Sequence, residues 1–230
     1  MIVYKNIYEF LQNKEKQQYQ QMIDYTNVSD NLDSDKIKEI CQQTEDNNFY
    51  GICVLPEFVS LAFSFLGNNK KISALIDFPK GESDTKTKIN KIDEAINNGA
   101  DEVDVVINYK LIKNEEDIEK LNEEIRKLTE YCHKEGVIIK IIIEIGALNY
   151  QDIEKICRIC INNNVDYIMT STGKLPNDDS FDKKIEKVKF MRKILPNETK
   201  IKFSGGIRNY SQVKELLPFV DRVGTSTLLN

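Results

Sequence analysis

Short apolar segments alternate with amphipathic segments along almost the whole chain. The apolar segments are rich in valine and isoleucine and are apolar on both faces, as is typical of parallel strands buried under helices. Eight such segments predict eight strands, at residues 21–24, 51–55, 72–77, 102–107, 138–144, 165–169, 201–203 and 222–224.

The segments between these strands carry apolar residues at helical spacing. Ile89, Ile92 and Ile96 form one stripe, and Gly99 follows it as a suitable residue for a helix end. Helices are predicted at residues 34–46, 56–66, 83–98, 114–135, 150–163, 182–195 and 211–217. We also expect an extra helix near residues 7–19, and a short or absent helix after the last strand.

This order of elements predicts the α/β class and a single (β/α)₈ TIM barrel spanning residues 1–230. An open doubly wound sheet is the alternative that the pattern leaves open. A missing final helix would leave one groove of the barrel uncovered, and a second copy of the chain in a homodimer is one way to cover it.

Charge and composition narrow the classes of partner. The net charge is −5 and both signs are mixed along the chain, so we expect no nucleic-acid partner and no membrane partner. Five cysteines at irregular spacing fit a reducing, cytoplasmic location. Cys157 and Cys160 share a stripe with Ile153 and Ile156, which favours helix packing over a redox or zinc pair.

Histidine is scarce, which bears on the chemistry. His133 is the only one, in a polar segment before Gly136, and we expect it at the surface. A metal-dependent aldolase normally needs several histidine ligands, so that class is disfavoured.

Glycine and hydroxyl residues recur where the last three strands end, at residues 170–174, 204–206 and 224–226. Glycine lets main-chain N–H groups approach an anion, and the loops after strands seven and eight form the usual phosphate site of this architecture. Plain turns would also use glycine, but the three segments together predict a phosphate site.

Two charged residues stand inside apolar strands. Asp104 is flanked by valines, and Lys202 lies between Ile201 and Phe203. Buried charges are costly unless they are paired, so one interpretation is a structural ion pair between them. The other is a general acid/base carboxylate with a tuned lysine at the functional ends of their strands. The two interpretations are compatible.

At these residues the chain resembles the deoxyribose-phosphate aldolase family, with a likeness that runs in order from about residue 20 to residue 228. The most specific segments are Gly-Ala-Asp-Glu-Val-Asp at residues 99–104 and Thr-Ser-Thr-Gly-Lys at residues 170–174. Residues 24–26, 202–206 and 222–226 add to the resemblance.

The resemblance implies a class I aldolase that cleaves 2-deoxyribose 5-phosphate to acetaldehyde and glyceraldehyde 3-phosphate through a lysine imine, with no metal or other cofactor. It implies a proton-relay role for Asp104 and makes Lys202 the second lysine, which perturbs the nucleophile. The residues expected to bind the phosphorylated sugar are Asp24, Thr26, Cys53, Thr172, Gly173, Lys174, Gly205, Gly206, Gly224, Thr225 and Ser226.

One departure from the family falls on the central catalytic position. The family has its Schiff-base lysine immediately before Thr-Ser-Thr-Gly-Lys, and this chain has Met169 there. A thioether cannot condense with a carbonyl, so the standard mechanism is blocked as written. Two other functions stay open: a non-catalytic sugar-phosphate-binding protein, and another phosphate-binding barrel enzyme such as an isomerase with Asp104 as acid/base.

Overall fold

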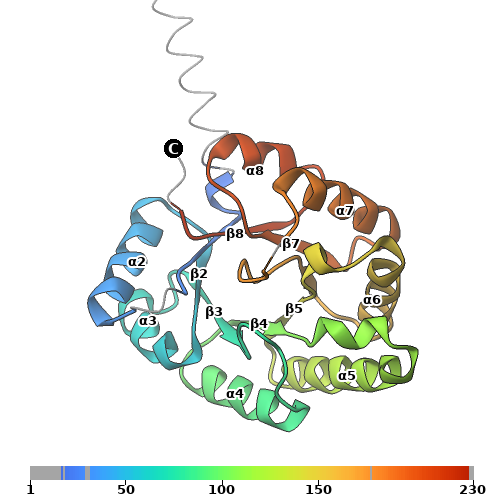
Figure 1. Cartoon of the computed structure of the whole chain (residues 1–230). Coiled ribbons are helices and arrows are strands. Elements are labelled where there is room, and N and C mark those ends of the chain that lie inside the picture. Colours follow the sequence, from blue (N-terminus) through green and yellow to red (C-terminus); the bar gives the residue numbers. More distant parts are fainter. Residues whose placement is uncertain (1–16, 18, 29–31, 177, 228–230) are drawn as a thin grey trace, which may run out of the picture.

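The computed structural model describes residues 17, 19–28, 32–176 and 178–227. Eight parallel strands pair there in sequence order, and the last pairs with the first, so that the sheet closes into a barrel (Figure 1). The strands are β1 (Ile23–Thr26), β2 (Gly51–Val54), β3 (Lys71–Ile76), β4 (Glu102–Val106), β5 (Ile138–Ile142), β6 (Tyr167–Met169), β7 (Lys200–Ser204) and β8 (Arg222–Thr225). Closure confirms the predicted barrel and rules out the open sheet.

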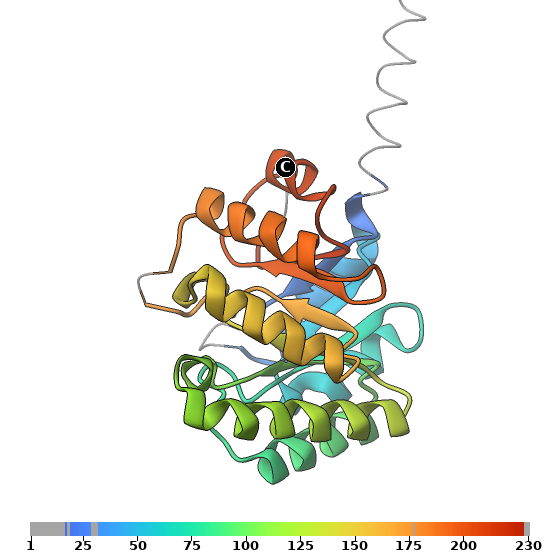
Figure 2. The ribbon, with the colours of Figure 1, turned by 90° about the vertical axis from the view of Figure 1, so that its right-hand side faces the viewer.

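Helices surround this barrel in the described part of the chain. They are α2 (Ser34–Asp46), α3 (Val59–Leu66), α4 (Thr85–Asn97), α5 (Ile118–Lys134), α6 (Tyr150–Asn162), α7 (Phe181–Ile194) and α8 (Tyr210–Leu216). Short 3₁₀ helices add η1 (Pro56–Phe58), η2 (Tyr109–Lys113), η3 (Glu115–Asp117) and η4 (Ile145–Ala147). Figure 2 shows α5, α6 and α7 stacked along one side of the barrel.

The predicted elements differ from the observed ones mainly at their ends. β1 begins at Ile23 instead of residue 21, because residues 21 and 22 form a turn. The helix expected near residues 7–19 lies almost entirely outside the described residues. The segment after β8 begins with a bend at Ser226 and Thr227, and its residues 228–230 also lie outside the described residues.

Local sequence explains where several helices begin. Asn149 caps α6 by accepting a hydrogen bond from the N–H of Asp152, whose side chain in turn accepts one from the N–H of Asn149. Asp84 accepts a hydrogen bond from the N–H of Thr87 at the start of α4. These caps satisfy N–H groups that have no partner in the first turn, and so they fix where each helix leaves its loop.

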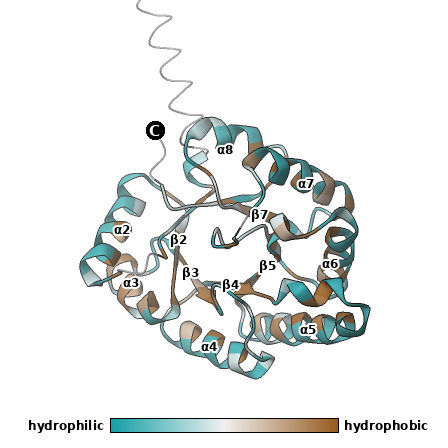
Figure 3. Cartoon of the chain, in the orientation of Figure 1, coloured by the Kyte–Doolittle hydropathy of each residue, from teal (hydrophilic) through white to brown (hydrophobic). Residues whose placement is uncertain are grey.

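The main core lies between the barrel and the helices. Outward-facing strand residues such as Val103, Ile168, Ile201 and Val223 pack there and are completely buried. In Figure 3 the helices are hydrophobic toward the strands and hydrophilic on their outer faces. No helix in the described residues is both long and apolar enough to cross a membrane.

The barrel interior has a different composition at different heights. Side chains alternate between the two faces of a strand, so Asp24 and Thr26 both face inward from β1, on successive levels. The lower of these levels is charged. The upper level holds a small apolar cluster of Cys53, Leu75, Val106, Ile142 and Met169. The functional cavity opens above this second level.

Candidate active site

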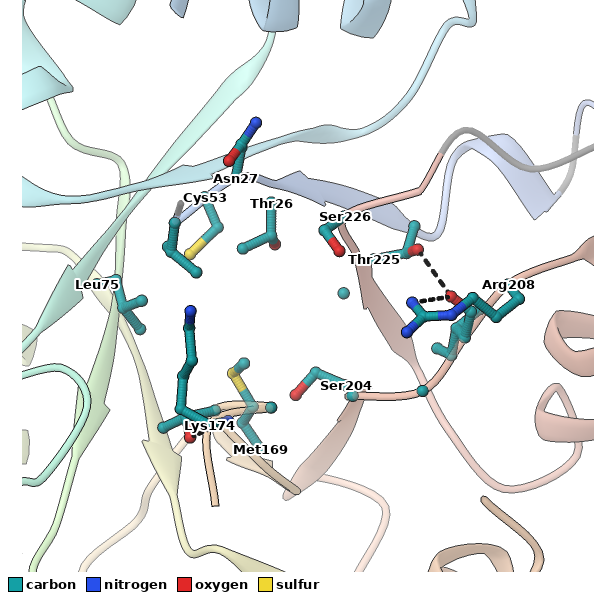
Figure 4. A pocket seen from close by; sticks show the side chains of 17 residues that line it. Thr26, Asn27, Cys53, Leu75, Met169, Lys174, Ser204, Arg208, Thr225 and Ser226 are labelled. Atoms are coloured by element: carbon teal, nitrogen blue, oxygen red, sulfur yellow. Dashed lines mark hydrogen bonds between the residues drawn. The ribbon is translucent and has the colours of Figure 1, made fainter. Parts of the chain in front are cut away.

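A cavity of about 420 Å³ opens at the carboxyl ends of the strands (Figure 4), where barrel enzymes place their chemistry. It is lined by the ends of β1, β2, β3, β6, β7 and β8 and by the loops that follow most of them. The predicted site residues on its wall are Thr26, Cys53, Met169, Thr172, Gly173, Lys174, Gly205, Gly206, Gly224, Thr225 and Ser226. Asp24, Asp104 and Lys202 face the barrel interior one level below.

Lys202 is the centre of the charged level beneath the cavity. Its Nζ lies 2.6 Å from Asp104 Oδ2 and 2.6 Å from Asp24 Oδ2. Arg222 Nη1 donates to Asp24 Oδ1 at 2.9 Å, and the Arg222 guanidinium stacks 3.3 Å from the ring centroid of Tyr50. The ion pair predicted between Asp104 and Lys202 is therefore present, and it belongs to a larger network.

Lys140, on β5, completes this network from the opposite side. Its Nζ donates to Asp104 Oδ1 at 2.7 Å and lies 2.6 Å from Glu102 Oε2. Ser73 also donates to Asp104 Oδ1 at 2.7 Å, and the Cys53 thiol lies 3.4 Å from Oδ2. Both oxygens of Asp104 are thus occupied by protein donors. The charge network, as we call it, consists of three carboxylates and three cations: Asp24, Glu102, Asp104, Lys140, Lys202 and Arg222.

Burial and pairing act in opposite directions on these groups, and pairing wins. Burial disfavours the carboxylate of Asp104, but the Lys140 and Lys202 ammonium groups outweigh it and hold the pKa of Asp104 well below its ordinary value. Burial likewise opposes the charge on Lys202, but Asp104 and Asp24 raise its pKa well above the ordinary value. The same balance raises the pKa of Lys140 to about 12. Both lysines are protonated at neutral pH.

Met169 ends β6 on the wall of the cavity, where it belongs to the apolar cluster and is 4% exposed. The strand register pairs it with Ile142 on one side and with Lys202 on the other. Methionine is unbranched and apolar, so it fits into the cluster that contains Cys53 and Leu75 without leaving a polar group unpaired. The Met169 side chain has no amine and therefore cannot form an imine.

The β7 and β8 side of the cavity has the features of an anion site. Gly205 and Gly206 have φ values of 84° and 90°, which a residue with a Cβ rarely adopts. A Cβ on Gly224 would lie 3.2 Å from Lys202 Cε and 3.2 Å from Ser204 Cβ, so glycine keeps this wall open. Ser226 lines the same cavity (Figure 4), and we call residues 204–206 and 224–226 the cradle.

Three predicted binding hydroxyls already have protein partners. The Thr26 hydroxyl donates to the main-chain oxygen of Asp24 at 3.3 Å. Thr225 Oγ1 donates a hydrogen bond to the main-chain oxygen of Ile207 at 3.3 Å and accepts one from the N–H of Thr227 at 3.2 Å. The Thr172 hydroxyl donates to Glu144. These hydrogen bonds shape the wall of the cavity, and direct contact between the three hydroxyls and a ligand stays a prediction.

The loop after β6 is anchored by Glu144. This residue has a left-handed conformation, with φ 51° and ψ 59°, and is 2% exposed. Its Oε1 accepts hydrogen bonds from the N–H of Thr172, at 3.0 Å, and from the Thr172 hydroxyl. Thr172 Oγ1 in turn accepts the N–H of Lys174 at 3.1 Å. Burial raises the pKa of Glu144, partly offset by the hydrogen bonds from Thr172.

Sequence reasoning missed several residues of the site. Lys140 lies between Ile139 and Ile141, the same signal that identified Lys202, and should have been found in the same way. Arg208 lines the cavity beside the cradle (Figure 4), two residues after the glycine pair. Glu102 and Arg222 were seen only as parts of motifs. No group of three or more His, Cys, Asp or Glu residues suited to a metal ion occurs in the described parts of the chain.

Fold and site together define a (β/α)₈ barrel with a lysine–carboxylate network under a cavity at the carboxyl ends of its strands. A family model for DeoC/LacD family aldolases matches residues 19–222, and the chain belongs to this family.

Individual relatives cover nearly the whole chain. The deoxyribose-phosphate aldolase of Treponema denticola is 35% identical over 208 residues, which cover 89% of this chain and 94% of that protein. The deoxyribose-phosphate aldolase of Thermococcus kodakarensis is 32% identical over 216 residues, 92% of this chain and 94% of its own. The solved structure of an aldolase designated QR15 is 31% identical, with a TM-score of 0.83, and covers 90% of this chain and 91% of that one.

Proposed function

We propose that this chain has the binding site of a deoxyribose-phosphate aldolase, and that Met169 disables the standard imine step of that enzyme. The observation that carries the proposal is the cavity itself, with a glycine and hydroxyl cradle on one side and the charge network beneath it. The family membership and the names of the relatives support 2-deoxyribose 5-phosphate as the ligand.

In this proposal the phosphate binds in the cradle and beside Arg208, because main-chain groups at glycines and a guanidinium both suit phosphate oxygens. The open-chain aldehyde end then extends across the cavity toward Cys53, Leu75 and Met169. Asp104 and Lys202 act from below, the carboxylate through proton transfer by way of water and the lysine through its positive charge. These roles are the ones that the family resemblance implies.

A second function, a non-catalytic sugar-phosphate-binding protein, is favoured by one specific observation. Met169 is packed in an apolar cluster, and the site is otherwise intact. An isomerase with Asp104 as acid/base is less well supported, because the matching family model and the named relatives are aldolases.

Turnover and binding of 2-deoxyribose 5-phosphate, measured on the natural chain and on Met169→Lys, test the proposal. We expect both proteins to bind the sugar phosphate, and Met169→Lys to gain turnover. A Met169→Lys protein that binds but stays inactive would instead support the non-catalytic function. If neither protein bound the sugar phosphate, the proposal would be refuted.

The assembly state belongs to the same proposal. The homodimer expected from the sequence would have a second copy of this chain as the partner. Light scattering coupled to size-exclusion chromatography measures the mass directly. A monomer at micromolar concentration would contradict the proposed homodimer.

A further inference from the structure

Among the described residues, we consider three lysines at or under the cavity, and two of them are engaged by carboxylates. Lys202 and Lys140 are completely buried, and each ammonium lies between two carboxylates at 2.6–2.7 Å. Each of these ammonium groups would have to leave both of its carboxylates, below the cavity, before it could lose a proton and attack a carbonyl. Neither one is therefore suited to replace the amine that Met169 lacks.

Lys174 differs from both. It is exposed and lines the same cavity as Met169. Within the described residues, its Nζ has neither a hydrogen bond nor a carboxylate within ion-pairing distance, while its main-chain N–H donates to Thr172 at 3.1 Å. Its side chain is thus free to meet a ligand.

The direction of the Lys174 side chain separates it from the phosphate end of the site. In Figure 4 its amine points into the cavity on the side of Leu75 and Cys53, whereas Ser226 and Thr225 lie on the other side. A sugar phosphate with its phosphate in the cradle would direct its aldehyde end away from Ser226. That end would approach the Lys174 amine.

The main chain that carries this amine is fixed. Glu144 holds Thr172 through its N–H and its hydroxyl, and Thr172 holds the N–H of Lys174. Only the flexible stem of Lys174 has to move for its amine to reach a bound aldehyde. The anchored loop therefore keeps the Lys174 amine close to the aldehyde end, and such proximity favours imine formation.

We propose that Lys174 is the residue that forms an imine with the aldehyde carbon of the bound sugar phosphate and that this imine supports aldol cleavage by this chain. This inference rests on the proposed function, since it takes the same ligand in the same cavity. It assigns Lys174 to the aldehyde end of the ligand, whereas the sequence had placed it among the residues binding the phosphorylated sugar.

The chemistry balances with water as the only other reactant. The neutral Lys174 amine adds to the aldehyde carbon, and the carbonyl oxygen leaves as water. The bond between the second and third sugar carbons then breaks, its electron pair forms an enamine, and the hydroxyl on the third carbon loses its proton to become the aldehyde of glyceraldehyde 3-phosphate. Protonation of the enamine carbon and hydrolysis of the imine release acetaldehyde and restore the amine.

Borohydride trapping with peptide mapping locates such an imine. The natural chain, Lys174→Arg and Lys193→Arg are each incubated with 2-deoxyribose 5-phosphate and borohydride, then digested and mapped by mass spectrometry. Lys193 is a matched control, because it is exposed on α7 and does not line this cavity. We expect an adduct on Lys174 in the natural chain and in Lys193→Arg, and its loss in Lys174→Arg.

Two further measurements exclude a merely electrostatic or surface reaction. Arginine keeps the positive charge but cannot form this imine, so Lys174→Arg should still bind 2-deoxyribose 5-phosphate by calorimetry. Inorganic phosphate should suppress the Lys174 adduct by filling the cradle, and a higher pH should increase it, because the neutral amine is the nucleophile.

The outcomes separate this inference from the proposed function. An adduct on Lys202 or Lys140, an adduct insensitive to phosphate, or a natural chain that binds the sugar phosphate without any adduct on Lys174 would overturn the inference. Met169→Lys would in those cases still gain turnover and an adduct at position 169. If neither protein bound the sugar phosphate, the proposed function would fail, and the inference with it.

Discussion

Met169 and Lys202 are direct neighbours across β6 and β7, yet they have opposite surroundings. Met169 faces the cavity among apolar side chains, whereas the Lys202 ammonium points down between Asp104 and Asp24. Any amine placed at position 169 would therefore stand beside a cation whose carboxylates are already engaged.

This relationship predicts that Met169→Lys raises turnover of 2-deoxyribose 5-phosphate. The new lysine would be partly desolvated and close to a positive charge, and both effects lower its pKa and increase the fraction of free amine. We expect a gain of about a hundredfold or more, equivalent to about 3 kcal/mol of activation free energy. Coupled detection of glyceraldehyde 3-phosphate gives the rate.

Met169→Leu is the control for this variant, since it keeps the apolar packing and supplies no amine. Equal rates for Met169→Lys and the natural chain would show that Met169 is not what limits the chemistry.

The charge network predicts a large stability effect for Asp104→Asn. The substitution leaves Lys140 and Lys202 without their shared carboxylate in a buried site, so the free energy of unfolding should fall by about 3 kcal/mol or more. Urea denaturation followed by circular dichroism measures the loss. Glu82→Gln removes the partner of Lys110 in an exposed pair and should leave the stability nearly unchanged. Similar values for the two variants would contradict the structural role of the network.

Glu144 predicts a pH dependence of stability. Its pKa in the folded chain is raised by burial above the ordinary value of 4.5. The folded state therefore binds the Glu144 proton more tightly than the unfolded state, and this contribution is complete below pH 4.5. It is lost as the pH rises through the folded value.

Glu144→Gln cannot titrate at this position, so it isolates the effect. The free energy of unfolding of the natural chain, minus that of Glu144→Gln, should decrease as the pH is raised from acid toward neutral. Denaturation series at several pH values test the sign. A difference that stays flat or increases with pH would show that Glu144 does not titrate as its burial requires.

The position of Arg208 predicts that replacing it weakens phosphate binding selectively. It lines the cavity on the cradle side, and a charge-assisted hydrogen bond to phosphate contributes about 1.5–3 kcal/mol. Arg208→Gln should therefore weaken binding of 2-deoxyribose 5-phosphate by about tenfold or more, as measured by calorimetry. Arg158→Gln changes an exposed arginine on α6 and should bind like the natural chain. An unchanged affinity for Arg208→Gln would place the phosphate elsewhere.

The fold was predictable from sequence because buried parallel strands and covering helices have different periodicities. The error at β1 arose because apolar Met22 directly precedes Ile23, although residues 21 and 22 form a turn. Asp104 and Lys202 were predictable as a pair, since two isolated charges in apolar strands must find partners. Lys140 carried the same signal and was missed because its strand was treated as uniformly apolar.

Other features of the site depend on three-dimensional direction, which periodicity does not contain. The Thr-Ser-Thr-Gly-Lys segment predicted a binding loop, but not that Thr172 would be engaged by Glu144. The same segment did not indicate that the Lys174 amine would face Leu75 and Cys53 instead of the cradle. Both facts follow from the left-handed turn at Glu144 and the path of the loop after β6.

The equal numbers of positive and negative groups in the charge network also bear on how this site changes during evolution. The charge of each of the six members is balanced by the others, so replacing one member alone leaves an uncompensated charge in the barrel. A tolerated substitution in the network would therefore need a second, compensating substitution. Position 169 is outside this balance. A lysine there can be gained or lost by a single substitution that leaves every ion pair below it in place, which makes the imine step the most easily separable part of the whole site.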